Sequence, residues 1–301
     1  MGALPILVAL LGVATLVSLI RRGRWPIELL THLRPHLIAA GLSGAALCVL
    51  LGERWEWAAI FAGLALVNYG ALPAPRWIKP QERLTSTPGL SVVWANVWKK
   101  RHALERTLDW AKAQSADVIL IGEFPDGDPA QFLADDYPHR VDTGPTPRET
   151  YVTRVVVLSR TPLEGVELVP GPGPNHRPWV TCKVRVGETL LNLVAVHPTP
   201  PTTAKLQQER DVHIAAIGGR MAEPFVLAGD FNATPWCPAF RLIPGRRVGG
   251  YLLAPTWFSN LPLLGLPIDH IMVSPALKAS AYRVAPSTGS DHRALLARVH
   301  P

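Results

Sequence analysis

The stretch Val226–Trp236, VLAGDFNATPW, decides the fold that we predict for this chain. An apolar run, Phe225–Ala228, ends at a glycine and is followed by Asp230 and Asn232. Such a run is typical of a buried strand, and the C-terminal ends of strands commonly carry the site of an α/β sheet. Residues i and i+2 of an extended chain point the same way, so we expect Asp230 and Asn232 to face one pocket. A carboxylate beside an amide suits phosphoryl chemistry. A polar turn is the alternative for this stretch alone.

Three apolar stretches open the chain, at Leu4–Ile20, Leu37–Gly52 and Trp57–Leu72. Each is about 16 or 17 residues long, which is at the short end of what spans a bilayer. The first stretch lacks the basic flank of a signal peptide, and the other two lack the polar face of a soluble amphipathic helix. We therefore predict a membrane anchor of three transmembrane helices over residues 1–75, in a multi-pass protein of the inner membrane with the lipid bilayer as a partner.

Basic residues set the predicted orientation of this anchor. Of the net charge of +7, residues 1–80 carry +4, with four arginines in the first loop. Basic loops stay on the cytoplasmic side, so the catalytic domain is expected there. The remaining residues carry only +3, which is not the strong excess of a protein that binds DNA non-specifically. The three cysteines are scattered without a C-x-x-C spacing, which indicates neither a disulfide framework nor a thiolate metal site.

Four prolines between residues 71 and 89 indicate a linker over residues 76–89. Residues 90–301 then alternate strand and helix patterns, as in an α/β domain. The helical patterns cover Arg101–Gln114 and Thr203–Arg220. The predicted strands are Leu90–Ala95, Asp117–Ile121, Tyr151–Leu158, Trp179–Val186, Thr189–Val196, Phe225–Ala228, Leu266–Val273 and Ala294–Val299.

A polar residue of a catalytic type lies at or beside the end of six of these strands. The set is Asn96, Glu123, His197, Asp230 with Asn232, Asp269, and Asp291 with His292. Each one taken singly is compatible with an ordinary turn or a solvated loop. Six such coincidences are much less probable than any one of them, so the set indicates a single site.

The motifs in their order resemble the endonuclease/exonuclease/phosphatase superfamily. The matching pieces are Asn96 in WANVW, Glu123 in VILIGEF, Ser159-Arg160 in VVVLSRTPL, His197 in LVAVHPTPP, LAGDFNATPW, Ile268-Asp269-His270 and GSDHRALLARV. The whole chain looks like a bacterial membrane-anchored branch of that superfamily. The resemblance implies a two-sheet β-sandwich flanked by helices, similar to deoxyribonuclease I. Glu123 follows a glycine where the family usually has glutamine, and the domain is short for a nuclease of this group.

The resemblance also implies a role for each matched residue. Glu123 would bind a divalent metal with Asp291, and Asn96 would complete or support that site. Asp230 would activate the attacking water, and Asn232 would hold the phosphate. His197 and His292 would stabilise charge on the phosphate or protonate the leaving oxygen, with Asp269 orienting His292. Arg160 is expected to be structural.

Oxygen ligands without thiolates favour Mg²⁺ or Mn²⁺ over Zn²⁺, and the absence of H-E-x-x-H excludes the usual zinc protease. We therefore expect a membrane-anchored, metal-dependent phosphodiesterase or phosphatase. Its substrate would be a lipid headgroup, a small phosphoester or nucleic acid. An endonuclease is the alternative, and a non-catalytic membrane binding module is a further one. No protein partner is inferred.

Overall fold

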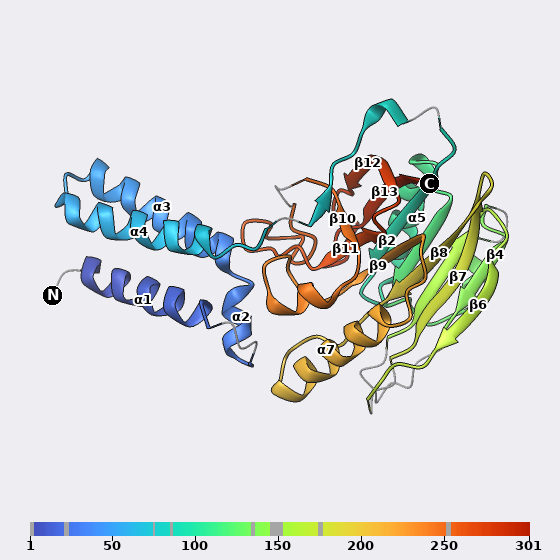
Figure 1. The fold of residues 1–301 in the computed structure, drawn as a ribbon, viewed down its shortest axis with the longest axis horizontal. Coiled ribbons are helices and arrows are strands. Elements are labelled where there is room, and N and C mark those ends of the chain that lie inside the picture. The colour runs from blue at the N-terminus through green and yellow to red at the C-terminus, as the bar shows by residue number, and fades with distance from the viewer. Residues whose placement is uncertain are drawn as a thin grey trace. The chain divides into compact units, whose positions relative to one another are not determined.

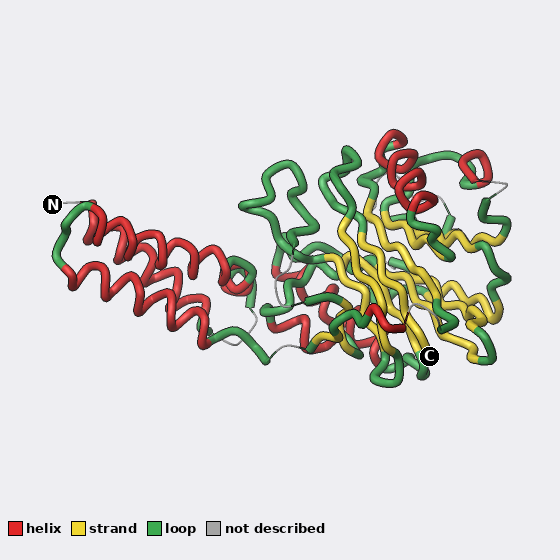
Figure 2. Tube along the Cα trace, turned by 90° about the horizontal axis from the view of Figure 1, so that it is seen from above, coloured by secondary structure: helices red, strands yellow, loops and turns green. Residues whose placement is uncertain are grey.

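The computed structural model describes residues 3–20, 24–74, 76–84, 87–133, 136–144, 153–173, 177–250 and 254–301. The chain divides into two compact units. The helical unit comprises Met1–Ala74 together with Thr234–Arg241, and the sheet unit comprises Pro75–Ala233 and Leu242–Pro301. Figures 1 and 2 show the helices of the first unit and the strands of the second.

The sheet unit contains two mixed sheets, as the resemblance implied. The seven-stranded sheet has the order β1 (Trp77–Ile78), β10 (Arg246–Val248), β11 (Asp269–Val273), β9 (Phe225–Asp230), β8 (Thr189–Val196), β7 (Trp179–Val186) and β6 (Glu164–Val169). The six-stranded sheet has the order β12 (Lys278–Val284), β13 (Leu295–His300), β2 (Leu90–Asn96), β3 (Val118–Gly122), β5 (Val155–Ser159) and β4 (His139–Asp142).

Strand direction brings the ends of several strands to one edge of each sheet. β2 pairs in parallel with β3, and β8 pairs in parallel with β9, so each pair ends at the same edge. β11 runs antiparallel to β9, and Asp269 at its start lies opposite Asp230 at the end of β9. β13 likewise runs antiparallel to β2. The start of β11 therefore lies at the same edge of the seven-stranded sheet as the ends of β8 and β9. The start of β13 likewise lies at the same edge of the six-stranded sheet as the ends of β2 and β3.

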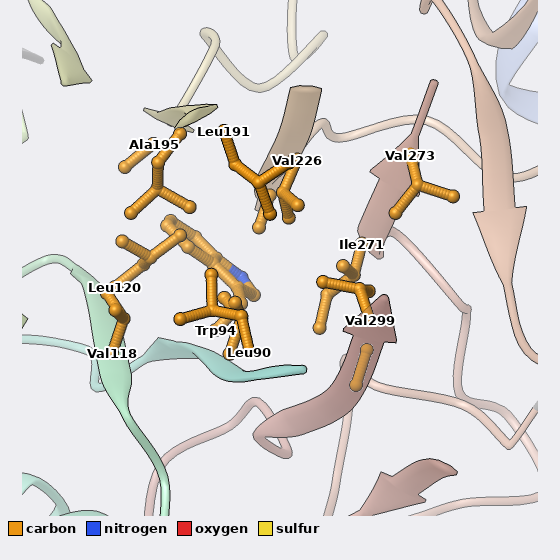
Figure 3. Close-up of a cluster of buried hydrophobic side chains, with 14 of the residues drawn as sticks. Leu90, Trp94, Val118, Leu120, Leu191, Ala195, Val226, Ile271, Val273 and Val299 are labelled. Carbon is orange, nitrogen blue, oxygen red and sulfur yellow. The ribbon is translucent and has the colours of Figure 1, made fainter. Parts of the chain in front are cut away.

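The main hydrophobic core lies between the two sheets. Strand residues alternate between the faces of a sheet, so Trp94 and Leu120 of one sheet meet Val226 and Ile271 of the other in this core (Figure 3). Trp94 is fully buried. Filling this core with large side chains fixes the spacing of the sheets, because a protein interior is close-packed.

Helices cover the outer faces of both sheets. The amphipathic helix α5 (Arg101–Ala113) packs Leu104 and Leu108 in a second apolar cluster with the outward residues of β2, β3 and β5. Helix α7 (Ala204–Gly218) buries His213 and Ile214, and the His213 ring lies 5.0 Å from the Trp179 ring of β7. A short helix, α6 (Ala130–Leu133), lies between β3 and β4 in the chain.

The helical unit contains α1 (Ala3–Ser18), α2 (Ile27–Thr31), α3 (Arg34–Leu50) and α4 (Trp55–Gly70). Helices α3 and α4 run side by side (Figure 1). Buried polar side chains tie α1 to α4, because the Asn68 amide donates to the Thr15 hydroxyl at 2.9 Å. The helices expose many apolar side chains, including Leu10, Leu50 and Trp55.

The prediction of three transmembrane helices is wrong. Among the described residues, no helix is both long enough and apolar enough to cross a membrane. The longest, α3, has 17 residues, which at 1.5 Å per residue extend about 26 Å, against roughly 30 Å for the hydrocarbon core of a bilayer. The predicted multi-pass inner-membrane location, and with it the cytoplasmic placement of the domain, rested on those spans and is overturned by the same finding.

Several strands are missing from the sequence prediction because their patterns are weak. β6 is mostly exposed, and β10 has only three residues. Within the predicted linker, Trp77 and Ile78 form β1 and pair with β10. Of the predicted strand Tyr151–Leu158, residues 151 and 152 lie outside the described residues, and the observed strand β5 begins only at Val155.

Candidate active site

The GDFN turn positions its two polar side chains through a close approach of strands and a left-handed residue. A Cβ on Gly229 would lie 2.4 Å from the Val196 carbonyl oxygen of β8, so glycine lets β9 lie against its neighbour. Asn232 has φ of 49°, a conformation that asparagine adopts more readily than most residues. Its backbone N–H donates to Asp230 Oδ1 at 2.9 Å. Phe231, between the two polar residues, is fully buried.

Asp230 is buried among groups that stabilise its ionised form. Oδ2 accepts a hydrogen bond from the Asn96 amide at 3.2 Å. The Nε2 atoms of His197 and His292 lie 3.4 and 3.6 Å from the same oxygen. Burial raises the pKa of Asp230, but the charge of His292 and the contact with His197 outweigh burial and hold this pKa well below its usual value. The carboxyl is therefore ionised at neutral pH.

Asp269 and His292 form a hydrogen-bonded pair. Asp269 Oδ2 and His292 Nδ1 are 2.8 Å apart, and Asp269 Oδ1 accepts a hydrogen bond from Trp94 Nε1 at 2.8 Å. Both residues of the pair are buried. Burial lowers the pKa of His292, but the charges of Asp269 and Asp230 raise it to about 10. With Nδ1 directed at Asp269, the Nε2 proton of the imidazolium faces the Asp230 side.

Glu123, Asn96 and His197 extend the cluster. Glu123 directly follows β3 with a left-handed φ of 53°, and its Oε1 accepts from the Asn96 amide at 3.1 Å. Asn96 Oδ1 accepts the Trp98 N–H, which turns the amide nitrogen toward both carboxylates. In this arrangement Asn96 donates to Glu123 and Asp230. His197 Nε2 lies 3.8 Å from Glu123 Oε1.

Asp291 is half-buried beside the same cluster. Burial raises its pKa, the charge of His292 lowers it, and the charge of Glu123 raises it. The Ser290 hydroxyl donates to the Asn96 carbonyl at 2.8 Å and accepts the His292 N–H at 3.1 Å. Ser290 thus joins the segment before β13 to the end of β2.

The structure brings the predicted residues Asn96, Glu123, His197, Asp230, Asp269 and His292 into one network of contacts, with Asn232 and Asp291 adjoining it in the chain. Arg160 lies apart from this network. It is exposed, and its guanidinium carbon lies 5.2 Å from the centre of the Tyr137 ring.

Among the described residues, the neighbours of the site that sequence reasoning missed include Trp94, Thr256 and Arg177. Trp94 supports Asp269, and its indole also fills the space that a Cβ on Gly122 would need, 2.8 Å away. Thr256 accepts the Asp269 N–H at 3.1 Å. Arg177 is buried with Nη1 3.4 Å from the His197 carbonyl, and burial lowers its pKa to about 10 against the charges of Glu123 and Asp230. Trp94 and Asn96 are two residues apart in β2 and therefore share a face of the sheet. The sequence could thus have indicated Trp94 as a neighbour of the site.

Two sets of residues are candidates for holding a metal in this site. The ligand-type atoms of Asp230, Asp269 and His292 all lie within 4.8 Å of one another. The 2.8 Å contact between Asp269 and His292 is a hydrogen bond, however, and such a contact shares a proton. Glu123 and Asp291, with oxygen donors only, are the set better suited to a hard cation.

Solved structures share the fold of the chain. An endonuclease/exonuclease/phosphatase protein from Beutenbergia cavernae is 20% identical with a TM-score of 0.58, over 71% of this chain and 72% of its own. An AP endonuclease from Archaeoglobus fulgidus is 18% identical with a TM-score of 0.56, over 69% and 98%. A sphingomyelinase C from Streptomyces griseocarneus is 16% identical with a TM-score of 0.50, over 70% and 99%. Identities this low show the fold alone.

Comparison with curated protein sequences yields no significant match. The model of the Endonuclease/Exonuclease/phosphatase family matches residues 93–292, which include every residue of the network described above. The match does not include residues 1–92, which contain helices α1 to α4, so the resemblance to a membrane-anchored branch has no support in it. With two mixed sheets, their helices and this match, the chain belongs to the endonuclease/exonuclease/phosphatase family.

Proposed function

We propose that the sheet unit is a divalent-metal-dependent phosphoester hydrolase. The observation that carries the proposal is the contact of one ionised, buried carboxylate, Asp230, with two histidines at 3.4 and 3.6 Å. A hydrolase needs a group that accepts a hydrogen bond from water and a group that supplies a proton. Asp230 and His292 are suited to these two roles because their pKa values are driven apart.

In this mechanism Asp230 orients the attacking water and takes its proton as the new bond to phosphorus forms. Its low pKa makes it a weak base at rest, so it accepts the proton only once the water becomes acidic in the transition state. His292, held by Asp269, donates a proton from Nε2 to the leaving oxygen. Asn232 Nδ2 donates one hydrogen to the Pro198 carbonyl at 3.1 Å, which leaves the second hydrogen for a phosphate oxygen.

Glu123 and Asp291 would hold the metal. Both are carboxylates, and these hard oxygen donors suit Mg²⁺ or Mn²⁺. When bound, such a cation supplies positive charge that stabilises the developing charge on the phosphate. Asn96 supports Glu123 by its hydrogen bond of 3.1 Å.

The test is hydrolysis of phosphomonoesters and phosphodiesters by the full chain with Mg²⁺ or Mn²⁺, before and after chelation. We expect turnover that stops with EDTA and returns with added metal. Glu123→Gln should raise the metal concentration needed, since it removes a charge from the ligand set. Activity that persists unchanged in EDTA would contradict the metal assignment, whereas tight binding of a phosphoester without cleavage would favour the non-catalytic binding module.

The surroundings of the site favour a phosphoester with an apolar part. Trp257 pairs with Leu266 to close a loop, and it also bridges to His292. Residues 254–267 carry no charge. The loop exposes Phe258, Leu261, Leu263 and Leu264, the third of these by 90%. A nucleic-acid site would instead need lysines and arginines along the phosphate backbone.

A further exposed aromatic side chain, Trp98, follows the site residue Asn96 by two positions in the chain. Trp98 is 46% exposed, and the Lys100 ammonium lies 3.5 Å from its ring centre. Lys100 also reaches the Gly289 carbonyl at 3.5 Å. Apolar tips with an adjoining cation match a lipid phosphodiester, whose chains are apolar and whose headgroup carries a phosphate.

Comparison of two substrates tests the lipid preference separately from catalysis. Leu263→Ser with Leu264→Ser should lower hydrolysis of phospholipid vesicles several-fold and leave hydrolysis of soluble bis(4-nitrophenyl) phosphate unchanged. The matched control is Leu242→Ser, an exposed leucine outside the loop. Equal loss on both substrates would indicate damage to the site, and faster cleavage of plasmid DNA than of vesicles would favour the endonuclease.

A further inference from the structure

A second group of potential metal ligands lies in the helical unit. Glu28, His32 and Cys237 each offer one ligand atom, and these atoms all lie within 4.8 Å of one another. All three residues are buried, at 1%, 5% and 2% exposure.

The backbone holds the three side chains in place. Glu28 lies in α2 and His32 caps its end, one helical turn later, so both side chains leave the same face of the helix. Cys237 lies in a turn closed by its N–H and the Thr234 carbonyl at 3.0 Å. Trp236, next to Cys237, donates its indole N–H to the His32 carbonyl at 2.9 Å. The turn is thereby fixed against the end of α2.

The distance between Glu28 and His32 is too long for a hydrogen bond and suits a shared ion. Glu28 Oε1 and His32 Nε2 are 3.8 Å apart, beyond the range of about 2.7–3.2 Å for such a bond. Two ligands at about 2.0–2.1 Å from one tetrahedral ion are roughly 3.4 Å apart. A small adjustment would complete that geometry.

Charge and ligand type select the ion. Metal binding requires a deprotonated thiol and a neutral imidazole, so the carboxylate and the thiolate would together offer two negative charges to a divalent cation. Thiolate, imidazole and carboxylate together suit Zn²⁺, with one coordination position left for a fourth ligand. We propose that Glu28, His32 and Cys237 form a zinc site that clamps the segment Thr234–Arg241 to α2.

The site differs in chemistry and in purpose from the catalytic one. Thr234–Arg241 directly follows the GDFN turn in the chain, so fixing this segment limits the freedom of the residues after Asn232. The clamp acts on stability, because binding a structural ion adds to folding free energy. It requires no phosphoester and does not rest on the proposed hydrolase function.

Cobalt substitution tests the clamp in the full-length protein. Co²⁺ bound to a thiolate gives a charge-transfer band in the near ultraviolet, which the carboxylate and imidazole groups of the active site cannot produce. We expect the chelator-treated protein to bind one Co²⁺ ion that produces this band. Addition of Zn²⁺ should displace that ion and abolish the band. Cys237→Ser should abolish the band, and Cys48→Ser, which alters another buried cysteine of the same unit, should retain it.

Further variants keep the proposal open to refutation if Cys237→Ser does not fold. Glu28→Gln and His32→Asn should each weaken Co²⁺ binding by at least about 100-fold, since the loss of even an outer-shell partner costs about 10–100-fold. Wild-type protein without the band would overturn the proposal, and Glu28 and His32 would then be a plain ion pair. A band that survives in both Glu28→Gln and His32→Asn would overturn it too.

Discussion

The buried cluster in the sheet unit and the one in the helical unit contain similar side chains at different distances. In the sheet unit, Asp269 and His292 touch at 2.8 Å. In the helical unit, Glu28 and His32 stand 3.8 Å apart near Cys237. The short contact shares a proton and fixes the direction of an imidazole, whereas the longer spacing suits an ion between the groups. The Asp269–His292 contact therefore suits the transfer of a proton, whereas the Glu28, His32 and Cys237 group suits the metal ion proposed above.

The largest expected effect is that of Asp230→Asn. The amide cannot take a proton from water, and its similar shape leaves the turn at Asn232 intact. We expect turnover to fall on the order of 10³-fold, within the range of general acid–base groups. Rates are to be measured with saturating metal on protein whose circular dichroism matches the wild type, and an Asp230→Asn variant with full activity would remove Asp230 from the mechanism.

His292→Ala should lower turnover by about 10²-fold, because the leaving oxygen loses its proton donor. Added imidazole should restore part of the rate, since it can occupy the space of the lost ring. Asp269→Asn should cost less, because His292 stays present but loses its oriented, charged partner. A greater loss for Asp269→Asn than for His292→Ala would contradict this order of roles.

His213 is buried in the sheet unit but lies outside the catalytic network, so its protonation should affect stability and not turnover. Burial lowers its pKa to about 3, helped by the charge of Arg177. The unfolded chain, with a pKa near 6.5, therefore binds more protons, and stability falls as the pH drops from about 6.5 toward 3. Between about pH 7 and pH 5 this linkage amounts to about 2 kcal/mol of unfolding free energy.

His213→Leu should remove this acid sensitivity and leave turnover unchanged, because His213 lies outside the catalytic network. Urea unfolding at the two pH values measures the difference. An equal loss of stability on acidification in wild type and variant would show that His213 titrates normally in the folded protein.

Trp94→Phe should lower turnover about five-fold. The substitution removes the hydrogen bond to Asp269, worth roughly 1 kcal/mol, and keeps an aromatic ring in the core. Trp110→Phe, at a partly buried tryptophan of α5 that packs against the second apolar cluster, is the matched control. Loss of stability without a change in rate would make Trp94 a packing residue only.

Cys237→Ser should have the smallest effect on chemistry. We expect an unchanged rate with saturating Mg²⁺ at low temperature, together with faster heat inactivation than Cys48→Ser. The zinc clamp and the catalytic metal then act independently. A drop in rate that excess Mg²⁺ reverses would instead link Cys237 to the catalytic metal and break the distinction between the two clusters.

The sequence predicted the sheet unit well where strands are long and apolar. Val226–Ala228 and Leu193–Val196 have the buried runs that specify central strands, and the polar residues at their ends marked the edge where the site lies. Weak strands such as β6 and β10 escaped because their stability comes from pairing with neighbours. The membrane spans were wrong because an apolar run gives composition, whereas crossing a bilayer also requires helix length.

The residue set Asn96, Glu123, His197, Asp230, Asn232, Asp269, Asp291 and His292 follows from the sequence by itself, because strand ends and motif order are local properties. Only the tertiary structure decided the contacts. Trp94 reaches Asp269 across 175 residues of chain, and Trp236 reaches His32 across 204. The scattered cysteines indicated no thiolate site, yet Cys237 meets Glu28 and His32. Spacing in the sequence shows only ligands that are close along the chain, whereas folding decides which distant side chains meet.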